Sequence, residues 1–474
     1  MRCRFRLLFV TLACLAAAGC AVGPDYTPPA PTGTAPQFLA PRPHGGSTAG
    51  LVGWWDRFDD PALPRLLTLA EIDSPSLTQA WAKIQAARAT LAGDQADRWP
   101  SLTASGSAQR GRQQSTAAAV TISNSLSVGL DASWEVDLFG KLRRTAEAAE
   151  ARQAARTDDW HDARVSLAAE VADTYVQYRA CQLLVTAYDD EAKSQQATAD
   201  ATNVSVRAGF TSTADGALAR AGAASAWATL TAQRAECDVL VKSLVDLTGA
   251  TEPALHDILA QSQARLPQPT VFAVDAVPAG LLVQRPDVAS AERELAAASA
   301  EIGAAEADRY PSLSLGGSIS RSGASLGSLM TTWLVGPSLS LPVFDAGKRA
   351  AAVDSAQAAY DYQLAAWRQS VRTAVKEVEQ SLVRLDGATR RTGDLQAAAQ
   401  GYRQYFESID RNWRAGGASL LDREQARRNA LSAEISFITV QRDQIQYWIA
   451  LYKALGGGWQ PESPATAPAS GEQS

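Results

Sequence analysis

The sequence predicts a mainly α-helical chain with membrane-spanning β-strands, built from two copies of one unit. Three observations predict this fold class. A block of seven residues recurs 211 positions later with one change, two stretches of more than sixty residues contain no proline, and two pairs of segments alternate apolar and polar side chains. The repeated unit is a helix, a β-hairpin and a long helical hairpin, in that order.

The composition excludes several classes of function. The chain has 474 residues, a net charge of −6 and 20% charged residues, which gives no electrostatic footprint for nucleic acid. His44, His161 and His256 are scattered, and no metal-ligand spacing appears. No nucleophile–base pair or phosphate-binding loop stands out. We therefore expect a protein that is not an enzyme and that holds no cofactor or metal.

The amino-terminal residues indicate export. Arg2, Arg4 and Arg6 precede an apolar run over residues 7–18, which is too short to span a membrane. We interpret residues 1–19 as a signal peptide.

The small residues before Cys20 are similar to a bacterial lipobox, in which the cysteine becomes the acylated first residue. Ala17 stands where that motif usually has leucine. Ala21 follows the cysteine where an aspartate would retain the protein at the inner membrane, so the similarity implies sorting to the outer membrane. The alternative is an ordinary cleaved signal with an incidental cysteine.

Both ends of the mature chain are expected to lack a core of their own. Residues 20–50 are rich in Pro, Gly, Ser and Thr, and form a lipid-anchored extended tether in this interpretation. Residues 458–474 have a similar composition and are expected to be a disordered tail.

Recurring motifs divide the remainder into two repeats. The block at 96–102 recurs at 307–313, and Arg207-Ala208-Gly209 recurs 207 positions later as Arg414-Ala415-Gly416. The expected parts are a first repeat over 51–249 with strands at about 101–137 and a helical hairpin at 141–249, an equatorial linker over 250–285, and a second repeat over 286–457 with strands at about 312–343 and a helical hairpin at 348–456.

Each repeat begins with a helix and continues with strands. The expected first helices cover residues 63–98 and 286–309, and both stop at an aromatic–proline pair, because proline disfavours helix in the residue before it. Period-2 alternation then predicts strands, clearest over 122–137 and 333–343 and weaker over 102–108 and 313–320. The stretches 109–121 and 321–332 are polar or glycine-rich and are expected as loops.

The four strands are interpreted as part of a membrane barrel. Strands of about ten residues can cross a bilayer, and four aromatic residues fall at the helix–strand junctions, where an interfacial belt would lie: Trp99, Phe139, Tyr310 and Phe344. Four strands cannot close a barrel, so closure requires other chains. The alternative is a soluble hairpin whose apolar face covers a core.

The long helical stretches 141–206 and 349–413 would reach roughly 100 Å. A stripe of mostly alanine and valine runs from Val165 to Ala187 at helical spacing, which favours close and nearly straight packing. A long coiled-coil rod would explain the helices but not the strands. Each hairpin turns at glycine, Gly209 or Gly416, and resumes after Ser212 or Ser419, for which N-capping is the accepted role.

Cys181 and Cys237 lie 28 residues either side of Gly209, so an antiparallel hairpin brings them level. In the oxidising periplasm they could form a disulfide. Two buried thiols are the alternative.

At this point the residues resemble the TolC-type outer-membrane efflux family, in its drug-efflux lipoprotein branch, which is NodT- and OprM-like. The resemblance covers essentially all of the mature chain and rests on these motifs in this order: Gly23-Pro24-Asp25-Tyr26; Trp54-Trp55 with Phe58 and Asp60-Pro61-Ala62-Leu63; Leu282 with Arg285-Pro286-Asp287; Phe344-Asp345-Ala346-Gly347; Arg414-Ala415-Gly416 with Ser419-Leu420-Leu421-Asp422.

The resemblance implies an architecture and a set of partners. It implies a homotrimer with a twelve-stranded β-barrel, four strands from each subunit, on a periplasmic α-barrel of twelve helices with an equatorial belt. It also implies a location in the cell outer membrane, a periplasmic adaptor (membrane fusion) protein and an inner-membrane pump of RND, MFS or ABC type. The adaptor would contact the hairpin tips: Arg207, Gly209, Ser212, Arg414, Gly416 and Ser419.

The resemblance also places a gate at the periplasmic tip, where acidic residues ring a constriction. Asp422 matches one such acid, but Gln425 stands where a second is expected. Our hypothesis is that Leu421 and Asp422 form the gate and that Arg423 pairs with a neighbour to hold it shut. The alternative for Asp422 is simple helix-start electrostatics.

The implied function is the exit duct of a tripartite efflux system that exports drugs or other small toxic compounds. Rival interpretations are a structural coiled-coil outer-membrane lipoprotein, or a duct for metal ions or other secreted solutes. Met1 and Met330 are the only methionines, so the sequence shows no Met or His ladder for soft metals.

Overall fold

The structure, a computed structural model, describes residues 21–30, 38–41, 51, 53–116, 119–262, 264–269, 271, 285–324 and 329–459. Its contacts divide the chain into two compact units. Unit 1 comprises residues 1–30, 81–158 and 290–370, and unit 2 comprises residues 31–80, 159–289 and 371–474.

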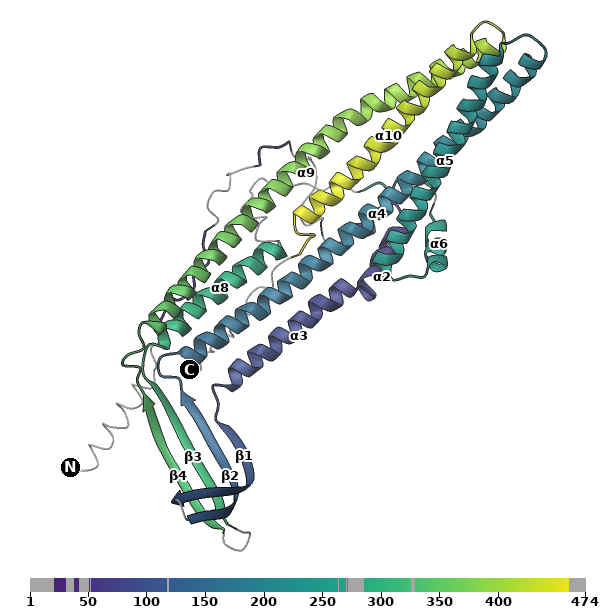
Figure 1. Cartoon of the computed structure of the whole chain (residues 1–474). Helices are drawn as coiled ribbons and strands as arrows, with labels where there is room; N and C mark the ends of the chain where they lie inside the picture. The colour runs from purple at the N-terminus through teal and green to yellow at the C-terminus, as the bar shows by residue number, and fades with distance from the viewer. Residues whose placement is uncertain are drawn as a thin grey trace, which may run out of the picture. The chain divides into compact units, whose positions relative to one another are not determined.

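The order of elements is the same in both halves of the chain (Figure 1). Each half contains one helix, two strands and two long helices in that order, and shorter helices precede and follow this series in the first half. The first half holds α3 (Pro75–Ala96), β1 (Ser101–Thr116), β2 (Ala119–Val136), α4 (Lys141–Arg207) and α5 (Thr213–Thr248). The second half holds α8 (Pro286–Ala307), β3 (Ser312–Gly323), β4 (Met330–Ser340), α9 (Lys348–Arg414) and α10 (Leu420–Ala454).

The four strands form one antiparallel sheet in unit 1, in the order β1-β2-β3-β4. Leu130 pairs with Ala104 on β1 and with Ile319 on β3, so the two hairpins of the duplicated unit are joined through β2 and β3. Apolar residues alternate along one face and remain exposed, including Val128 at 60% and Trp333 at 74%. An exposed apolar sheet face needs a partner that the single chain does not provide.

The predicted hairpin loop at 109–121 is wrong. β1 continues to Thr116 and β2 begins at Ala119, so most of that stretch is a two-stranded ribbon. The second loop is also shorter than predicted, because β3 reaches Gly323 and β4 begins at Met330. Polar composition misled the prediction, since cross-strand backbone hydrogen bonds hold such a ribbon without an apolar face.

The single helix predicted over 63–98 is also wrong. The structure has two helices, α2 (Ala62–Ile72) and α3, separated at Asp73 and Ser74. Ser74 accepts a hydrogen bond from the backbone N–H of Leu77 at 3.3 Å, and Pro75 occupies the first position of α3. Serine followed by proline is a helix start, which the apolar periodicity on both sides concealed.

The core of unit 2 surrounds α4. Most of the predicted stripe on this helix is buried, with Ala172 and Val176 fully enclosed and Val165 and Leu183 partly buried. It packs with α2, with α6 (Glu252–Ala260) and with the carboxyl end of α10. The short η2 (Trp55–Arg57) precedes α2, and the ring of Trp54 stacks on Tyr452 at 4.9 Å.

A buried polar chain fixes the same region. The hydroxyl of Tyr175 donates to Asp60 at 2.6 Å, and Arg179 donates from Nε to that hydroxyl and from Nη2 to the carbonyl of Leu259. Because each of these groups has partners, their burial does not leave an uncompensated charge. α2, α4 and α6 are therefore held together around one core.

Candidate functional site: the tips of the two helical hairpins

The two hairpin turns end alike. Gly209 and Gly416 have φ of 78° and 80°, a left-handed conformation that favours glycine. Ser212 then caps α5 and Ser419 caps α10, each accepting a backbone N–H from an aspartate three residues on. The sequence predicted these caps correctly.

A groove of about 680 Å³ lies between the two turns within unit 2. Of the predicted tip and gate residues, it brings together Ser212, Arg414, Ser419 and Leu421. Arg207, Gly209 and Gly416 belong to the adjoining helix ends and turns. Phe210, which the sequence analysis did not single out, lines the groove and is 88% exposed. The tips thus present a polar groove with exposed apolar side chains, Phe210 and Leu421.

Asp422 belongs to a capping box. Its carboxylate accepts hydrogen bonds from the hydroxyl of Ser419 at 2.6 Å and from the backbone N–H of Ser419 at 3.2 Å. These hydrogen bonds lower the pKa of the Asp422 carboxyl. In a single chain the residue therefore has the helix-start role, and it stays fully charged at neutral pH.

Arg423 does not point into solvent beside Asp422. It is buried, and its Nε donates to Asp410 on α9 at 2.5 Å. Its Nη1 donates to the hydroxyl of Thr198 on α4, and its guanidinium lies 4.6 Å from the ring of Trp413. The pairing predicted for Arg423 thus occurs with residues of its own chain, and it links α10 to both α9 and α4.

Sequence reasoning missed the rest of this cluster. Glu424 and Arg427, one and four positions after Arg423, are also buried, and the Arg427 guanidinium donates to Glu424 and to Thr198. Arg427 Nε lies 3.8 Å from Glu191 of α4. We call Glu191, Asp410, Arg423, Glu424 and Arg427 the latch cluster. The only sequence signal was the spacing of charges on α10, which usually marks a solvated face.

Burial shifts the pKa values of two members of the latch cluster, Glu191 and Arg427. It raises the pKa of the Glu191 carboxyl and lowers the pKa of the Arg427 guanidinium, since both charged forms lose hydration. Breaking one partner of a buried ionic group costs about 3–5 kcal/mol, because it leaves a charge without compensation. The cluster can therefore hold the second hairpin against α4, and it can be released by changing charges.

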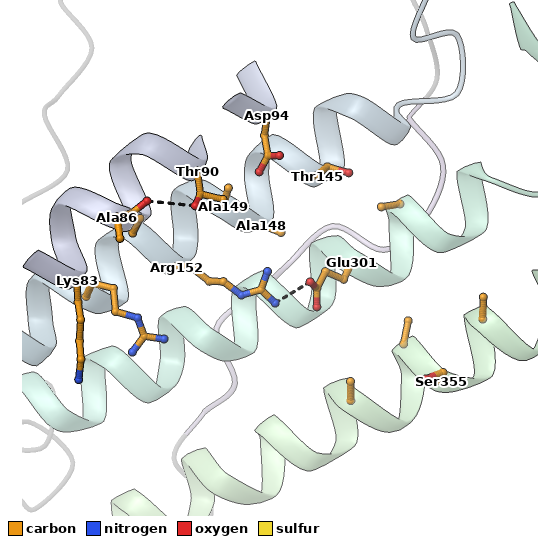
Figure 2. Close-up of a pocket in the computed structure, with 16 residues that line it drawn as sticks. Lys83, Ala86, Thr90, Asp94, Thr145, Ala148, Ala149, Arg152, Glu301 and Ser355 are labelled. Carbon is orange, nitrogen blue, oxygen red and sulfur yellow. Dashed lines mark hydrogen bonds and ion pairs between the residues drawn. The ribbon is translucent and has the colours of Figure 1, made fainter. Parts of the chain in front are cut away.

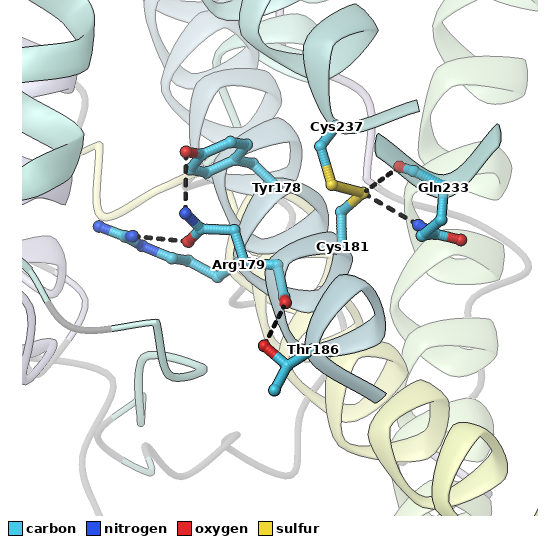
Figure 3. Close-up of a disulfide and its surroundings, with 7 residues drawn as sticks. Tyr178, Arg179, Cys181, Thr186, Gln233 and Cys237 are labelled. Atoms are coloured by element: carbon cyan, nitrogen blue, oxygen red, sulfur yellow. Dashed lines mark hydrogen bonds between the residues drawn. A yellow bond between two sulfur atoms is a disulfide. The ribbon is translucent and has the colours of Figure 1, made fainter. Parts of the chain in front are cut away.

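The first hairpin is held covalently. Cys181 on α4 and Cys237 on α5 form a disulfide, with Cα atoms 5.7 Å apart (Figure 3). The amide Nε2 of Gln233 donates to Cys181 Sγ at 3.0 Å. Of the two alternatives that the sequence left open, the structure contains the disulfide.

Comparison with known proteins identifies the family. The family described as "Outer membrane efflux protein" matches residues 66–250 and 277–457. The chain belongs to the outer membrane efflux protein family. The two matched segments correspond to the two repeats, so this efflux protein carries the family's sequence in both halves.

Individual relatives match this chain over nearly its full length. The chain is 31% identical over 479 residues to the probable efflux pump outer membrane protein TtgC of Pseudomonas putida, covering 96% of each chain. It is 29% identical to nodulation protein T of Rhizobium leguminosarum, covering 94% of this chain and 96% of the other. The solved structure of the outer-membrane channel OprN matches with a TM-score of 0.82 and 30% identity, covering 93% of this chain and all of the other. The TolC-like channel fold and the NodT- and OprM-like branch are thereby shown.

Unit 1 of this efflux protein contains a second groove, of about 720 Å³, along α3, α4, α8 and α9 (Figure 2). Half of the residues that line it are alanines, and Arg152 pairs across it with Glu301 at 2.6 Å. Small side chains leave room for a closely packed neighbour or for passing solute. The groove offers surface rather than reactive groups.

Residues 21–25 pack against other parts of unit 1. The backbone N–H of Val22 donates to the carbonyl of Phe139 at 3.2 Å, and Asp25 pairs with the buried Arg144 at 2.7 Å. Gly23 lies against Gly303 of α8, where a Cβ would come within 2.3 Å of the Gly303 Cα. Cys20, the predicted lipidation site, lies outside the described residues, but Ala21 next to it is beside Gly140.

The four predicted interfacial aromatics lie at one end of the sheet, next to the strand termini that adjoin the helices. Phe139 stacks on Tyr310 with centroids 4.8 Å apart. Trp99 precedes β1 and Phe344 follows β4, and these two rings are 74% and 89% exposed. All four residues lie at this end because β1 and β3 begin there and β2 and β4 end there.

Two kinds of feature are absent from the described part of the chain. It contains no group of three His, Cys, Asp or Glu side chains that could hold a metal ion. No helix within the described ranges is long and apolar enough to cross a membrane.

Proposed function

We propose that three copies of this efflux protein assemble in the outer membrane as the exit duct of a tripartite efflux system. Each copy would contribute four strands to a twelve-stranded barrel and four long helical segments to a periplasmic α-barrel. One observation carries the proposal: the four-stranded sheet exposes an apolar face and is too small to close on itself. The names of its relatives refer to toluene, antibiotic and solvent efflux, and they supply the expected cargo class.

We propose that the partners are a periplasmic adaptor and an inner-membrane pump of RND, MFS or ABC type. The adaptor would contact the groove between the hairpin tips, where Phe210 is exposed and Ser212, Arg414 and Ser419 supply polar groups. In this proposal the pump would determine the substrate, and the chain would conduct what the pump delivers.

The anchor is proposed at Cys20 after removal of residues 1–19. Residues 21–26 support this site, because their first residue, Ala21, lies beside the strand–helix junction at Gly140, where the interfacial aromatics also lie. Acylation there would place the lipid at the membrane surface. The Cys181–Cys237 disulfide is proposed to form in the same oxidising compartment.

The gate is proposed at Leu421 and Asp422. Arg423 would hold these residues in place through its contacts in the latch cluster. Three copies of Asp422 near one axis would repel one another and attract cations. Asp422→Ala should raise single-channel conductance in planar bilayers. The matched control is Asp215→Ala, which removes the equivalent capping acid of the first hairpin. Equal conductance of wild type and Asp422→Ala would reject this gate.

The duct itself is tested by purification and by drug susceptibility. We expect detergent-purified protein to be trimeric, to contain both helix and strand, and to form channels in planar bilayers. Deleting the gene should sensitise cells to compounds that the neighbouring pump exports, and plasmid-borne protein should restore resistance. A monomer without channel activity would disprove the proposal.

A further inference from the structure

Two arginines occupy equivalent positions in the two repeats of the sheet. Arg110 on β1 and Arg321 on β3 are 211 positions apart, the same offset that separates Leu102 from Leu313. Each arginine follows a run of apolar or glycine residues at every second position: Leu102, Ala104, Gly106 and Ala108 on β1, and Leu313, Leu315, Gly317 and Ile319 on β3. Both runs therefore end on a positive charge after the same number of steps.

The pairing register places these charges on one face. Val128 pairs with Gly106 and with Arg321, and Asn124 pairs with Arg110. Arg112 lies one further step along the same face of β1 and pairs with Ile122. Side chains two residues apart on a strand share a face, so the three arginines lie on the exposed apolar face of the sheet.

No acid accompanies them on this face. Asp131 and Glu135, the acids of the described strands, lie on the opposite face, where Asp131 pairs with Thr103 and Ser318. All three arginine side chains are exposed, and within the described part of the chain none forms an ion pair or hydrogen bond. Three exposed guanidinium groups without an acidic neighbour, at the end of an apolar face, are free to bind an anionic partner outside the chain.

The distance along the strand indicates where that partner lies. The eight steps from Leu102 to Arg110 span about 26 Å at about 3.3 Å per residue. Strands tilted by about 40° reduce this to about 20 Å along the membrane normal, close to the height of a barrel's apolar band. The arginines thus stand at the membrane boundary opposite the interfacial aromatics.

We propose that Arg110, Arg112 and Arg321 bind the phosphate groups of anionic lipids in the outer leaflet of the outer membrane. This rests on the proposed function, in which the sheet spans that membrane. Guanidinium groups suit the role, since their planar donors bind phosphate through two parallel hydrogen bonds. In a trimer the arginines would form a basic ring that fixes the depth of the barrel.

The test compares two charge-matched variants of the full-length trimer. One is Arg110→Gln with Arg112→Gln and Arg321→Gln. The control is Arg372→Gln with Arg384→Gln and Arg391→Gln, which removes three exposed positive charges from α9. Binding of diphosphoryl lipid A to each trimer in phosphatidylcholine nanodiscs is measured, with inorganic phosphate as competitor.

We expect the strand variant to lose more than tenfold in affinity, since one arginine at an anionic surface contributes about fivefold. The control should bind like wild type, and added salt should weaken wild type towards the variant. Inorganic phosphate should not displace the lipid. Equal binding by wild type and strand variant, or an equal loss in the control, would overturn the proposal.

Single-channel conductance of the same variants in planar bilayers distinguishes failure of the lipid site from failure of the proposed duct. Channels formed by every variant, combined with unchanged lipid binding, would reject the lipid site alone. Absence of channels in wild type would reject the spanning sheet and the lipid site together.

Discussion

The two helical hairpins share a length, a glycine turn and a serine cap, but they are held by different forces. The first is joined covalently by Cys181 and Cys237. At the equivalent positions, 207 residues later, the second has Ala388 and Gln444, where Gln444 only donates a hydrogen bond to Thr389 at 3.1 Å. The second hairpin is instead held by the latch cluster near its tip.

The difference indicates which hairpin can move. A disulfide cannot be released without a reductant, whereas a buried ionic cluster can separate when its charged groups become hydrated. Phe406 and Trp413 flank the Arg423 guanidinium, which keeps the cluster dry in the described conformation. We infer that the first hairpin is the fixed part of the tip and that the second is the part that opens.

The largest expected effect is that of Arg423→Ala. This change removes one of the two cations from each of the buried acids Asp410 and Glu424, which keep Arg414 and Arg427. Losing these buried contacts should lower the free energy of unfolding by about 3–5 kcal/mol, and single-channel conductance should rise. Thermal unfolding and planar-bilayer recordings measure the two effects.

Arg390→Ala is the control for this change, because it removes an exposed ion pair with Asp386 on the same hairpin. That change should cost less than about 1 kcal/mol and leave conductance unaltered. A conductance of Arg423→Ala equal to that of wild type would show that the cluster does not restrain the tip.

The second effect concerns the disulfide. Cys181→Ser with Cys237→Ser should lower stability by about 2–4 kcal/mol, yet leave conductance unchanged, because the hairpin it joins does not move. Thermal unfolding of wild type with and without reductant checks the loss of stability. Reduced wild type should be as stable as the double variant. If conductance rose as in Arg423→Ala, both hairpins would have to move and the comparison would fail.

A smaller difference is expected between the two caps. Ser212→Ala and Ser419→Ala should each cost about 1 kcal/mol of stability. Each serine hydroxyl also donates to the carboxylate of its own aspartate. Ser419→Ala alone should change conductance, because only Asp422 belongs to the proposed gate. Identical conductance of the two variants would show that the Ser419 cap has no influence on the gate.

The smallest effect is a pH dependence that arises from Glu191. Burial raises the pKa of this carboxyl in the closed latch, beside Arg423, Glu424 and Arg427. A latch that opens would hydrate Glu191 and return its pKa to the ordinary range. The closed state then binds protons more tightly, so acidification through the window between these two pKa values favours closure.

We therefore expect conductance to fall as the pH is lowered through that window. Glu191→Gln should remove this dependence, while Glu434→Gln, on an exposed pair with Arg403, should keep it. Conductance that rose on acidification in wild type would contradict the assigned role of Glu191.

The sequence by itself determined the fold class and the position of the hairpin tips. Repetition at fixed offsets, proline-free stretches and alternating strands are local signals, because helix and strand periods are written in consecutive residues. The glycine turns and the serine caps were predictable for the same reason. The polar ribbon beyond Ala108 and the break at Ser74 were not, since pairing partners and capping there outweighed the apolar pattern.

Only the tertiary structure decided what Arg423 contacts and which of its neighbours are buried. Asp410, Thr198 and Glu191 lie 13, 225 and 232 residues from Arg423, and no periodicity relates such distant positions. Charges on a helix are normally solvated, so burial becomes visible only when α9 and α4 pack around α10. Likewise, the strand register alone places Arg110 and Arg321 on the apolar face.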